Sequence, residues 1–189
     1  PLLAQLGYQG PVFATPATIE MTTLILRDSA RIQDADARRA KRGGGRGRSA
    51  RPPNPPLYTA QDAEEILSRL RTVSLRKAIQ VAPGIQAMWT EAGHMLGSGS
   101  IRLVVQEDGR EKRVVFSGDL GPKSALILRE YEPFHEADLV FLESTYGDRD
   151  HRPFTETVDE LVGIVKEAVE SGGRILVPTF AVGRAQLIT

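Results

Sequence analysis

Two hairpin signals lie close together in the middle of the chain, and they constrain the fold more than any other feature. Strand-like runs at 101–106 and 112–116 flank Asp108-Gly109, a dipeptide that favours a two-residue hairpin turn. Another pair of runs, at 78–81 and 85–89, precedes them around a Pro-Gly turn. Strands joined by such short turns pair antiparallel. The sequence therefore predicts an antiparallel sheet in this region.

Helical signals lie on both sides of the hairpins. Thr15 before Pro16 predicts a helix that runs to Arg31, and Thr59 with Asp62 forms a capping-box pattern at the start of another. The remaining expected elements are short strands at 10–15 and 138–142, a helix with apolar residues at 158–169 that ends at Gly172-Gly173, a strand at 174–177 and a helix at 182–188. Because hairpins pass into a β-α-β pattern, we predict a layered α/β (α+β) fold, with the 138–142 strand buried.

Composition narrows the class of protein. Hydrophobic residues make up 41% of the chain and charged residues 25%, which is typical of a globular protein. A length of 189 residues fits one domain, or one domain and part of another. Since 24 basic residues balance 24 acidic ones, any attraction to nucleic acid or to a membrane must be local.

The chain contains no cysteine, which excludes disulfides, zinc–thiolate sites and cysteine nucleophiles. This absence fits a reducing compartment, and we expect a cytoplasmic protein. No apolar run approaches the roughly 20 residues of a membrane span, so we expect no membrane partner. Because the chain starts at Pro1 and stops at Thr189 inside an apolar stretch, we expect a piece of a longer protein.

Three of the predicted strands end in Gly/Ser-rich turns that each carry one ionisable residue. These residues are His94, Asp119 and Glu143. Ligand sites in layered α/β folds gather on loops at strand ends, and small neighbours let the backbone approach a ligand closely. Imidazole and carboxylate are donors that zinc accepts. We therefore predict His94 and Asp119 as two ligands of a metal site, with Glu143 acting beside it.

Each of these residues also has a simpler interpretation. A lone loop histidine is more often structural, an aspartate between glycines often only satisfies turn amides, and Glu143 can be a solvated strand end. An ionisable residue follows three predicted strands in succession, and this repetition favours the metal site over the simpler interpretations. The other histidines, His135 and His151, are assigned to structural roles, although His151 lies near Glu143 in the sequence.

A segment rich in Arg, Gly and Pro at 38–56 predicts a mobile loop. Its basic residues are suited to phosphate contacts, which would make nucleic-acid binding sensitive to salt. No aromatic residue interleaves them, so base stacking is not expected there. A solvated loop with no ligand is the alternative.

Five stretches of the chain resemble one known family. A-G-H-M-L-G-S-G-S (92–100), F-S-G-D-L-G (116–121) and L-E-S-T-Y-G (142–147) closely resemble motifs of the β-CASP ribonucleases, which have the metallo-β-lactamase fold. The nearest branch contains bacterial and archaeal relatives of the nuclease subunit of the cleavage and polyadenylation specificity factor. The stretches 10–18 and 177–186 resemble the same group.

The resemblance implies a fold and a division into domains. Residues 1–148 would form the later part of a metallo-β-lactamase αββα sandwich, and residues 149–189 would begin the inserted β-CASP domain. It also implies roles for three side chains. His94 would bind one zinc ion, Asp119 would bridge two zinc ions, and Glu143 would orient a distant histidine.

The implied activity is zinc-dependent hydrolysis of RNA phosphodiester bonds. The enzyme would be an endonuclease that can also have exonuclease activity. RNA would be the substrate. The resemblance is compatible with a homodimer as well as with a monomer, and it assigns no substrate-binding residues. The family's His-x-His-x-Asp-His run is absent, and the chain has three histidines in all. We therefore expect this piece to be inactive alone and to fold poorly by itself.

Two alternatives remain. One is a non-catalytic relative that binds RNA or a nuclease partner. The other is a hydrolase of small thioesters or lactams, but such enzymes lack segments like 142–147 and 174–186, which counts against it.

Overall fold

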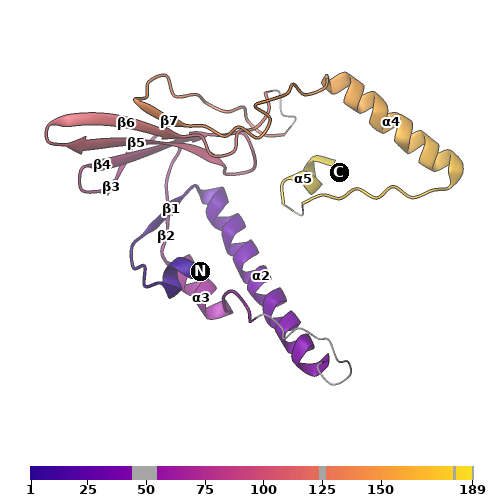
Figure 1. Ribbon diagram of the computed structural model, residues 1–189, viewed down its shortest axis with the longest axis horizontal. Coiled ribbons are helices and arrows are strands. Elements are labelled where there is room, and N and C mark those ends of the chain that lie inside the picture. Colours follow the sequence, from indigo (N-terminus) through magenta and orange to yellow (C-terminus); the bar gives the residue numbers. More distant parts are fainter. Residues whose placement is uncertain (44–54, 124–126, 181, 189) are drawn as a thin grey trace. The chain divides into compact units, whose positions relative to one another are not determined.

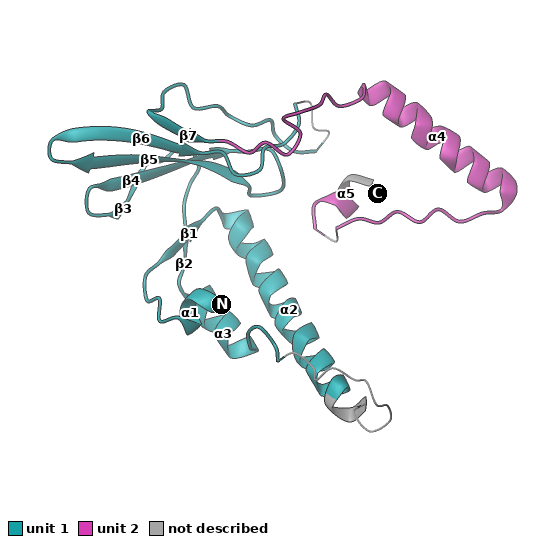
Figure 2. Cartoon of the chain, in the orientation of Figure 1, with its two compact units in different colours: residues 1–141 teal, residues 142–189 magenta. Residues whose placement is uncertain are grey.

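The structure of the chain is a computed structural model, and Figure 1 shows its helices and strands. It describes residues 1–43, 55–123, 127–180 and 182–188. Most of the basic segment expected at 38–56 lies outside the described residues. The chain forms two compact units, Pro1–Phe141 and Leu142–Thr189 (Figure 2). The domain boundary that we expected after residue 148 stays a prediction.

The first unit contains a five-stranded sheet with the strand order β3-β4-β5-β6-β7 (Figure 1). Its strands are β3 (Ile79–Ala82), β4 (Ile85–Glu91), β5 (Gly99–Glu107), β6 (Arg110–Phe116) and β7 (Leu139–Phe141). Neighbours pair antiparallel from β3 to β6, and β7 pairs parallel with β6. Both predicted hairpins are confirmed, and so is the mixed α/β class.

The turn between β5 and β6 follows from its two residues. Asp108 and Gly109 have φ angles of 50° and 71°, and the flanking residues Glu107 and Arg110 are paired. Positive φ at both central positions is what a type I′ hairpin needs, and Asp-Gly accepts it readily. The turn therefore sets the register between β5 and β6.

Helices and a smaller sheet precede this sheet along the chain. They are α1 (Leu2–Gln5), β1 (Val12–Ala14), α2 (Pro16–Gly43), α3 (Ala60–Ser68) and β2 (Leu70–Thr72), with β1 and β2 paired parallel. The capping box of α3 is confirmed: the Asp62 N–H donates to Thr59 Oγ1, and the Thr59 N–H donates to Asp62 Oδ2. The hydrogen bonds from Thr59 hold the pKa of the Asp62 carboxyl below its ordinary value.

Helix α2 is longer than the sequence pattern indicated. We expected it to end at Arg31 and a loop to begin at Arg38, but the helix continues to Gly43. The extension consists mostly of good helix formers and contains no glycine or proline before its last residue. The Arg38 guanidinium also lies 2.7 Å from Asp34, an i,i+4 ion pair that supports a helix.

The core of the first unit lies between the two sheets. Val73, Ala87 and Trp89 are buried. The partly buried side chains packed against them are Phe13, Leu75, Ile79, Val81, Ile101 and Leu103. Because Phe13 belongs to β1 and Ile101 to β5, this core joins the small sheet to one face of the large one.

Strand β7 differs from its prediction. The apolar run at 138–142 indicated a buried strand, but Leu139, Val140 and Phe141 are 50–52% exposed. Among the described residues β7 has a strand neighbour on one side only, so its other edge is open. Asp138 anchors its start: its Oδ2 accepts the Arg113 N–H, and its Oδ1 lies 2.8 Å from the Lys112 amine.

The second unit contains α4 (Phe154–Ser171) and α5 (Arg184–Ile188). Helix α4 ends as predicted at Gly172, which adopts a left-handed conformation with φ of 64°. The strand predicted at 174–177 is wrong, because the structure shows no strand there and Leu176 is 91% exposed. A strand requires a paired neighbour, and the described residues provide none for this run. No helix in the described ranges has both the length and the apolar character needed to cross a bilayer.

Candidate functional site

The ends of three strands share one edge of the large sheet. Strands β4 and β6 both run antiparallel to β5, so they point in the same direction and end on the same side. Strand β7 is parallel to β6 and ends there too, where the Ser117 N–H donates to the Phe141 carbonyl oxygen (2.9 Å). The turn after β4 carries His94, and the turn after β6 carries Asp119.

The two turns are in direct backbone contact. The Gly121 N–H donates to the carbonyl oxygen of Ala92 at 2.8 Å. A Cβ atom on Gly121 would lie 1.7 Å from the carbonyl oxygen of Gly93, so only glycine fits at this point. Gly93 itself has a φ of 66°. These glycines allow the β4 and β6 turns to approach each other although β5 separates their strands.

The loop after β4 is organised around Ser98. Its Oγ accepts the N–H groups of His94 (3.1 Å) and Met95 (3.2 Å). The Ser98 N–H donates to the Met95 carbonyl oxygen, and the Ala92 N–H donates to the Ser98 carbonyl oxygen. Four hydrogen bonds thus close residues 92–98 into a compact loop with the backbone of His94 held inside it.

The turn after β6 is anchored in the sheet. The carbonyl oxygen of Ser117 accepts the Ser100 hydroxyl at 2.7 Å, and both serines are buried. Gly118 follows with a φ of 59°, so Asp119 comes two residues after a buried, hydrogen-bonded serine.

The two predicted ligands lie together. The Nε2 atom of His94 is 3.7 Å from the Oδ2 atom of Asp119, with side chains 33% and 71% exposed. Two ligands of one tetrahedral zinc ion, each about 2.0–2.1 Å from the metal, lie about 3.3 Å apart. The donor types and their separation therefore fit two members of a zinc ligand set, and the exposed carboxylate leaves the pair open to a further ligand.

The described residues do not complete a metal site. In residues 1–43, 55–123, 127–180 and 182–188, no group of three His, Asp or Glu side chains converges to hold an ion. Protein zinc sites commonly use at least three protein ligands. His135 is exposed, and the His151 ring packs against the Tyr146 ring with centroids 4.4 Å apart.

Glu143 belongs to the second unit. Its Oε2 accepts the Thr145 hydroxyl at 2.7 Å, and the Gly147 N–H donates to the Ser144 carbonyl oxygen in the turn that follows. This arrangement holds the carboxylate within the L-E-S-T-Y-G stretch. Its action beside His94 and Asp119 stays a prediction.

Glu132 is hydrogen-bonded to the last two residues of β4, directly before the loop that carries His94. It was not selected from the sequence. Its carboxylate forms two hydrogen bonds with the Arg76 guanidinium, which hold the pKa of Glu132 below its ordinary value. Its N–H donates to the Glu91 carbonyl oxygen, and its own carbonyl oxygen accepts the Thr90 hydroxyl. The Arg76 and Glu132 partners are 56 residues apart, so no local pattern could identify them.

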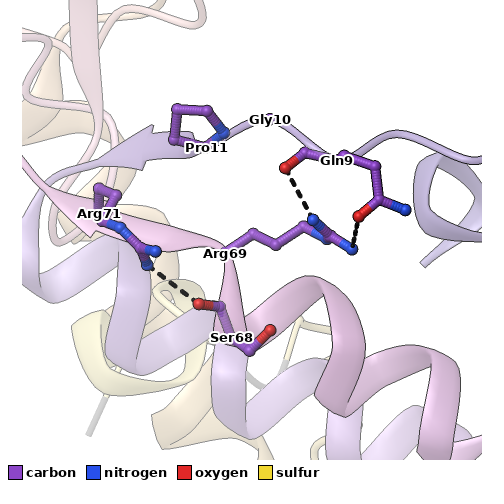
Figure 3. A pocket seen from close by; sticks show the side chains of 6 residues that line it. All are labelled: Gln9, Gly10, Pro11, Ser68, Arg69 and Arg71. Carbon is purple, nitrogen blue, oxygen red and sulfur yellow. Dashed lines mark hydrogen bonds between the residues drawn. The ribbon is translucent and has the colours of Figure 1, made fainter.

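A separate pocket lies between the segment before β1 and the end of α3 (Figure 3). The Arg69 guanidinium donates to the carbonyl and side-chain oxygens of Gln9, and Arg71 donates to the Ser68 carbonyl oxygen. The Arg69 bonds tie the chain before β1 to the end of α3, and the Arg71 bond is local. The pocket lining contains neither His94 nor Asp119, and the observed role of its arginines is structural.

Comparisons with known proteins identify relatives along the whole chain. The ribonuclease TTHA0252 of Thermus thermophilus is 36% identical over 188 residues, which cover 100% of this chain and 38% of the relative. The transcription termination factor FttA of Cenarchaeum symbiosum is 30% identical over 100% of this chain and 27% of its own length. The endoribonuclease YSH1 of Eremothecium gossypii is 30% identical over 99% of this chain and 23% of its own length.

Other comparisons add little. No protein family model matches the chain. Among solved structures, a subclass B3 metallo-β-lactamase from a soil metagenome library matches with a TM-score of 0.28 and 18% identity, over 56% of this chain and 31% of that one. At that score the likeness carries no argument about the fold. The chain spans about a quarter to two fifths of the length of the curated relatives named above, and along its own length it is a distant homologue of the β-CASP ribonucleases.

Proposed function

We propose that the chain is part of a zinc-dependent ribonuclease that hydrolyses RNA phosphodiester bonds. In this proposal residues 1–148 are the later part of a metallo-β-lactamase αββα domain, and residues 149–189 begin a β-CASP domain. His94 and Asp119 would be metal ligands, Asp119 would be shared between two ions, and Glu143 would be the acid that orients a distant histidine. RNA is the proposed substrate.

The observation that supports the proposal is the pairing of His94 with Asp119. Two turns from non-neighbouring strands are joined by the Gly121–Ala92 hydrogen bond, and they bring an imidazole nitrogen and a carboxylate oxygen to 3.7 Å. Glycine permits this close approach of the two backbones, and the result is a pair of convergent polar groups of the kind that ligand sites contain. The ribonuclease and endoribonuclease names of two relatives support RNA as the substrate class.

The roles of the side chains follow from their chemistry. Neutral His94 would donate a nitrogen lone pair through Nε2, and the negative charge of Asp119 would offset part of the charge of the bound cation. Bound zinc would supply Lewis-acid stabilisation of charge on a phosphoryl oxygen. The remaining ligands are not among the described residues, and the His-x-His-x-Asp-His run that supplies them in the family is absent from this sequence.

The test is a cleavage assay of the complete protein with metal analysis. We expect Asp119→Ala to lower zinc content and RNA cleavage together, because the substitution removes a ligand rather than a packing group. Asp108→Asn is the matched control, since Asp108 occupies the exposed hairpin turn where asparagine also accepts a positive φ. The control should keep both properties.

Two results would refute the proposal. If the Asp119→Ala protein cleaves RNA at the unsubstituted rate, the ligand role is wrong. If the complete protein binds RNA but neither holds zinc nor cleaves, the non-catalytic binding function is the correct one.

A further inference from the structure

The first turn of α2 lies against the loop that carries His94. The hydroxyl groups of Thr15 and Thr18 both lie 2.7 Å from the carbonyl oxygen of Gly97. Thr15 also caps the helix, because its Oγ1 accepts the Thr18 N–H. Thr15 is 5% exposed. A buried hydroxyl and its helix neighbour thus hold one carbonyl of a loop about 80 residues further along the chain.

The close approach is visible at the glycine as well. Gly97 has a φ of 87°, and a Cβ atom there would lie 2.6 Å from the Thr18 nitrogen and 2.8 Å from the Thr18 Oγ1. The backbone of Gly97 therefore packs directly against the backbone of Thr18, and the 92–98 loop is in contact with the first turn of α2. Two independent observations, the shared hydrogen-bond acceptor and the forbidden Cβ position, therefore describe the same contact.

The protons of this contact can be counted. Each threonine hydroxyl donates one hydrogen bond, and a carbonyl oxygen accepts two. The two hydroxyl oxygens are themselves 2.9 Å apart. Three arrangements fit these distances: both hydroxyls donate to Gly97, Thr15 donates to Thr18 while Thr18 donates to Gly97, or Thr18 donates to Thr15 while Thr15 donates to Gly97. Thr18 takes part in all three, either as a donor to the loop or as the partner that orients the Thr15 hydroxyl.

The contact is transmitted to His94 through a short path. Gly97 is followed by Ser98, whose Oγ accepts the His94 N–H and the Met95 N–H. Seating the Gly97 carbonyl on α2 restricts Ser98, and Ser98 restricts the backbone that carries the imidazole. Without the threonine donors, the Gly97 carbonyl would have to find water, and the loop could leave the helix.

We propose that Thr15 and Thr18 are positioning residues that seat the 92–98 loop on α2 and thereby hold His94 at Asp119. This rests on the proposed function for its catalytic consequence, but the seating of the loop is a property of this chain alone. Outer partners that orient metal ligands affect metal affinity strongly.

The experiment substitutes Thr18 and leaves the helix cap at Thr15 intact. Thr18→Val keeps the side-chain volume and removes the hydroxyl, and Thr18→Ser restores the hydroxyl. Thr23→Val is the matched control, because Thr23 lies in the same helix but its hydroxyl donates to Ile19 within that helix. The complete protein carries each change, and amide hydrogen exchange, zinc affinity and RNA cleavage kinetics are measured.

We expect Thr18→Val to speed exchange of the His94 and Met95 amides about fivefold, which corresponds to loss of one ordinary hydrogen bond. Zinc affinity should fall about tenfold. At saturating zinc, kcat should fall while KM for RNA stays constant. Thr18→Ser should recover all three values, and Thr23→Val should change none of them.

The proposal is overturned if Thr18→Val leaves exchange of the two amides unchanged, or if Thr18→Ser fails to restore it. Failure of the proposed function has a different signature. In that case the unsubstituted protein neither holds zinc nor cleaves RNA, while the amides of the loop still respond to Thr18→Val and recover in Thr18→Ser.

Discussion

Gly121→Ala is the sharpest test of the loop contact that brings the two predicted ligands together. The added Cβ would lie 1.7 Å from the Gly93 carbonyl oxygen, 2.2 Å from the Gly93 carbonyl carbon and 2.8 Å from the His94 nitrogen. All three are backbone atoms, so no side-chain rotation relieves the clash. Ordinary contact begins at 3.4 Å, and the loops would have to separate by about 1.7 Å to reach it.

The magnitude follows from two effects. Overpacking of this kind costs about 1–3 kcal/mol, and separation of the loops also breaks the Gly121–Ala92 hydrogen bond, which is worth about 1 kcal/mol. We therefore expect the free energy of unfolding to fall by about 2–4 kcal/mol. A separation of this size would also carry the His94–Asp119 pair beyond the spacing that one zinc ion can span, so zinc affinity should fall by more than about tenfold.

The assay is urea unfolding of the complete protein together with a zinc titration. Gly109→Ala is the control, because its Cβ would meet no atom within 4 Å and only its positive φ of 71° opposes the change. We expect the control to lose about 1 kcal/mol through backbone strain and to keep its zinc affinity. Wild-type stability and zinc affinity in the Gly121→Ala protein would refute the contact between the loops.

Two further predictions concern the start of β7 and the proposed acid. Hydrogen bonds from Lys112 and Arg113 hold the pKa of Asp138 below its ordinary value of 3.8. The stabilisation by Asp138 is therefore complete above pH 3.8 and is lost as the pH falls below 3.8 through the lowered pKa, so Asp138→Asn should make urea unfolding less dependent on pH in that window. Glu143→Gln should slow RNA cleavage by the complete protein while its zinc content, measured by metal analysis, stays nearly unchanged. If the stability of the Asp138→Asn protein falls below pH 3.8 as steeply as that of the unsubstituted protein, the first prediction is wrong. If the Glu143→Gln protein loses zinc together with activity, Glu143 is a ligand or a folding residue.

Local signals in the sequence identified most of the regular elements. Asp108-Gly109 predicted the turn of the β5–β6 hairpin, Thr59 with Asp62 predicted the start of α3, and Gly172 predicted the end of α4. Each of these features depends on backbone conformations and hydrogen bonds within a few residues, so the sequence contains the whole cause.

The errors have the opposite character. The strand predicted at 174–177 and the burial predicted for β7 both require neighbours from elsewhere in the molecule. An apolar run has β propensity, but it becomes a strand only where another strand satisfies its backbone. The length of α2 was underestimated because the glycines and prolines of the segment 38–56 were taken to place all of it in a loop, although the residues before Gly43 are mostly good helix formers.

The candidate site also combines features with local causes and features that depend on distant segments. His94 and Asp119 could be selected as candidate ligands from the sequence, because both are metal-binding residue types in turns of small residues. That the two side chains meet could be learned from the three-dimensional packing alone. Their strands are separated by β5, and the 3.7 Å approach depends on the Gly121 contact between the two turns. Local chemistry selects the donors, but convergence depends on packing between segments that are distant along the chain.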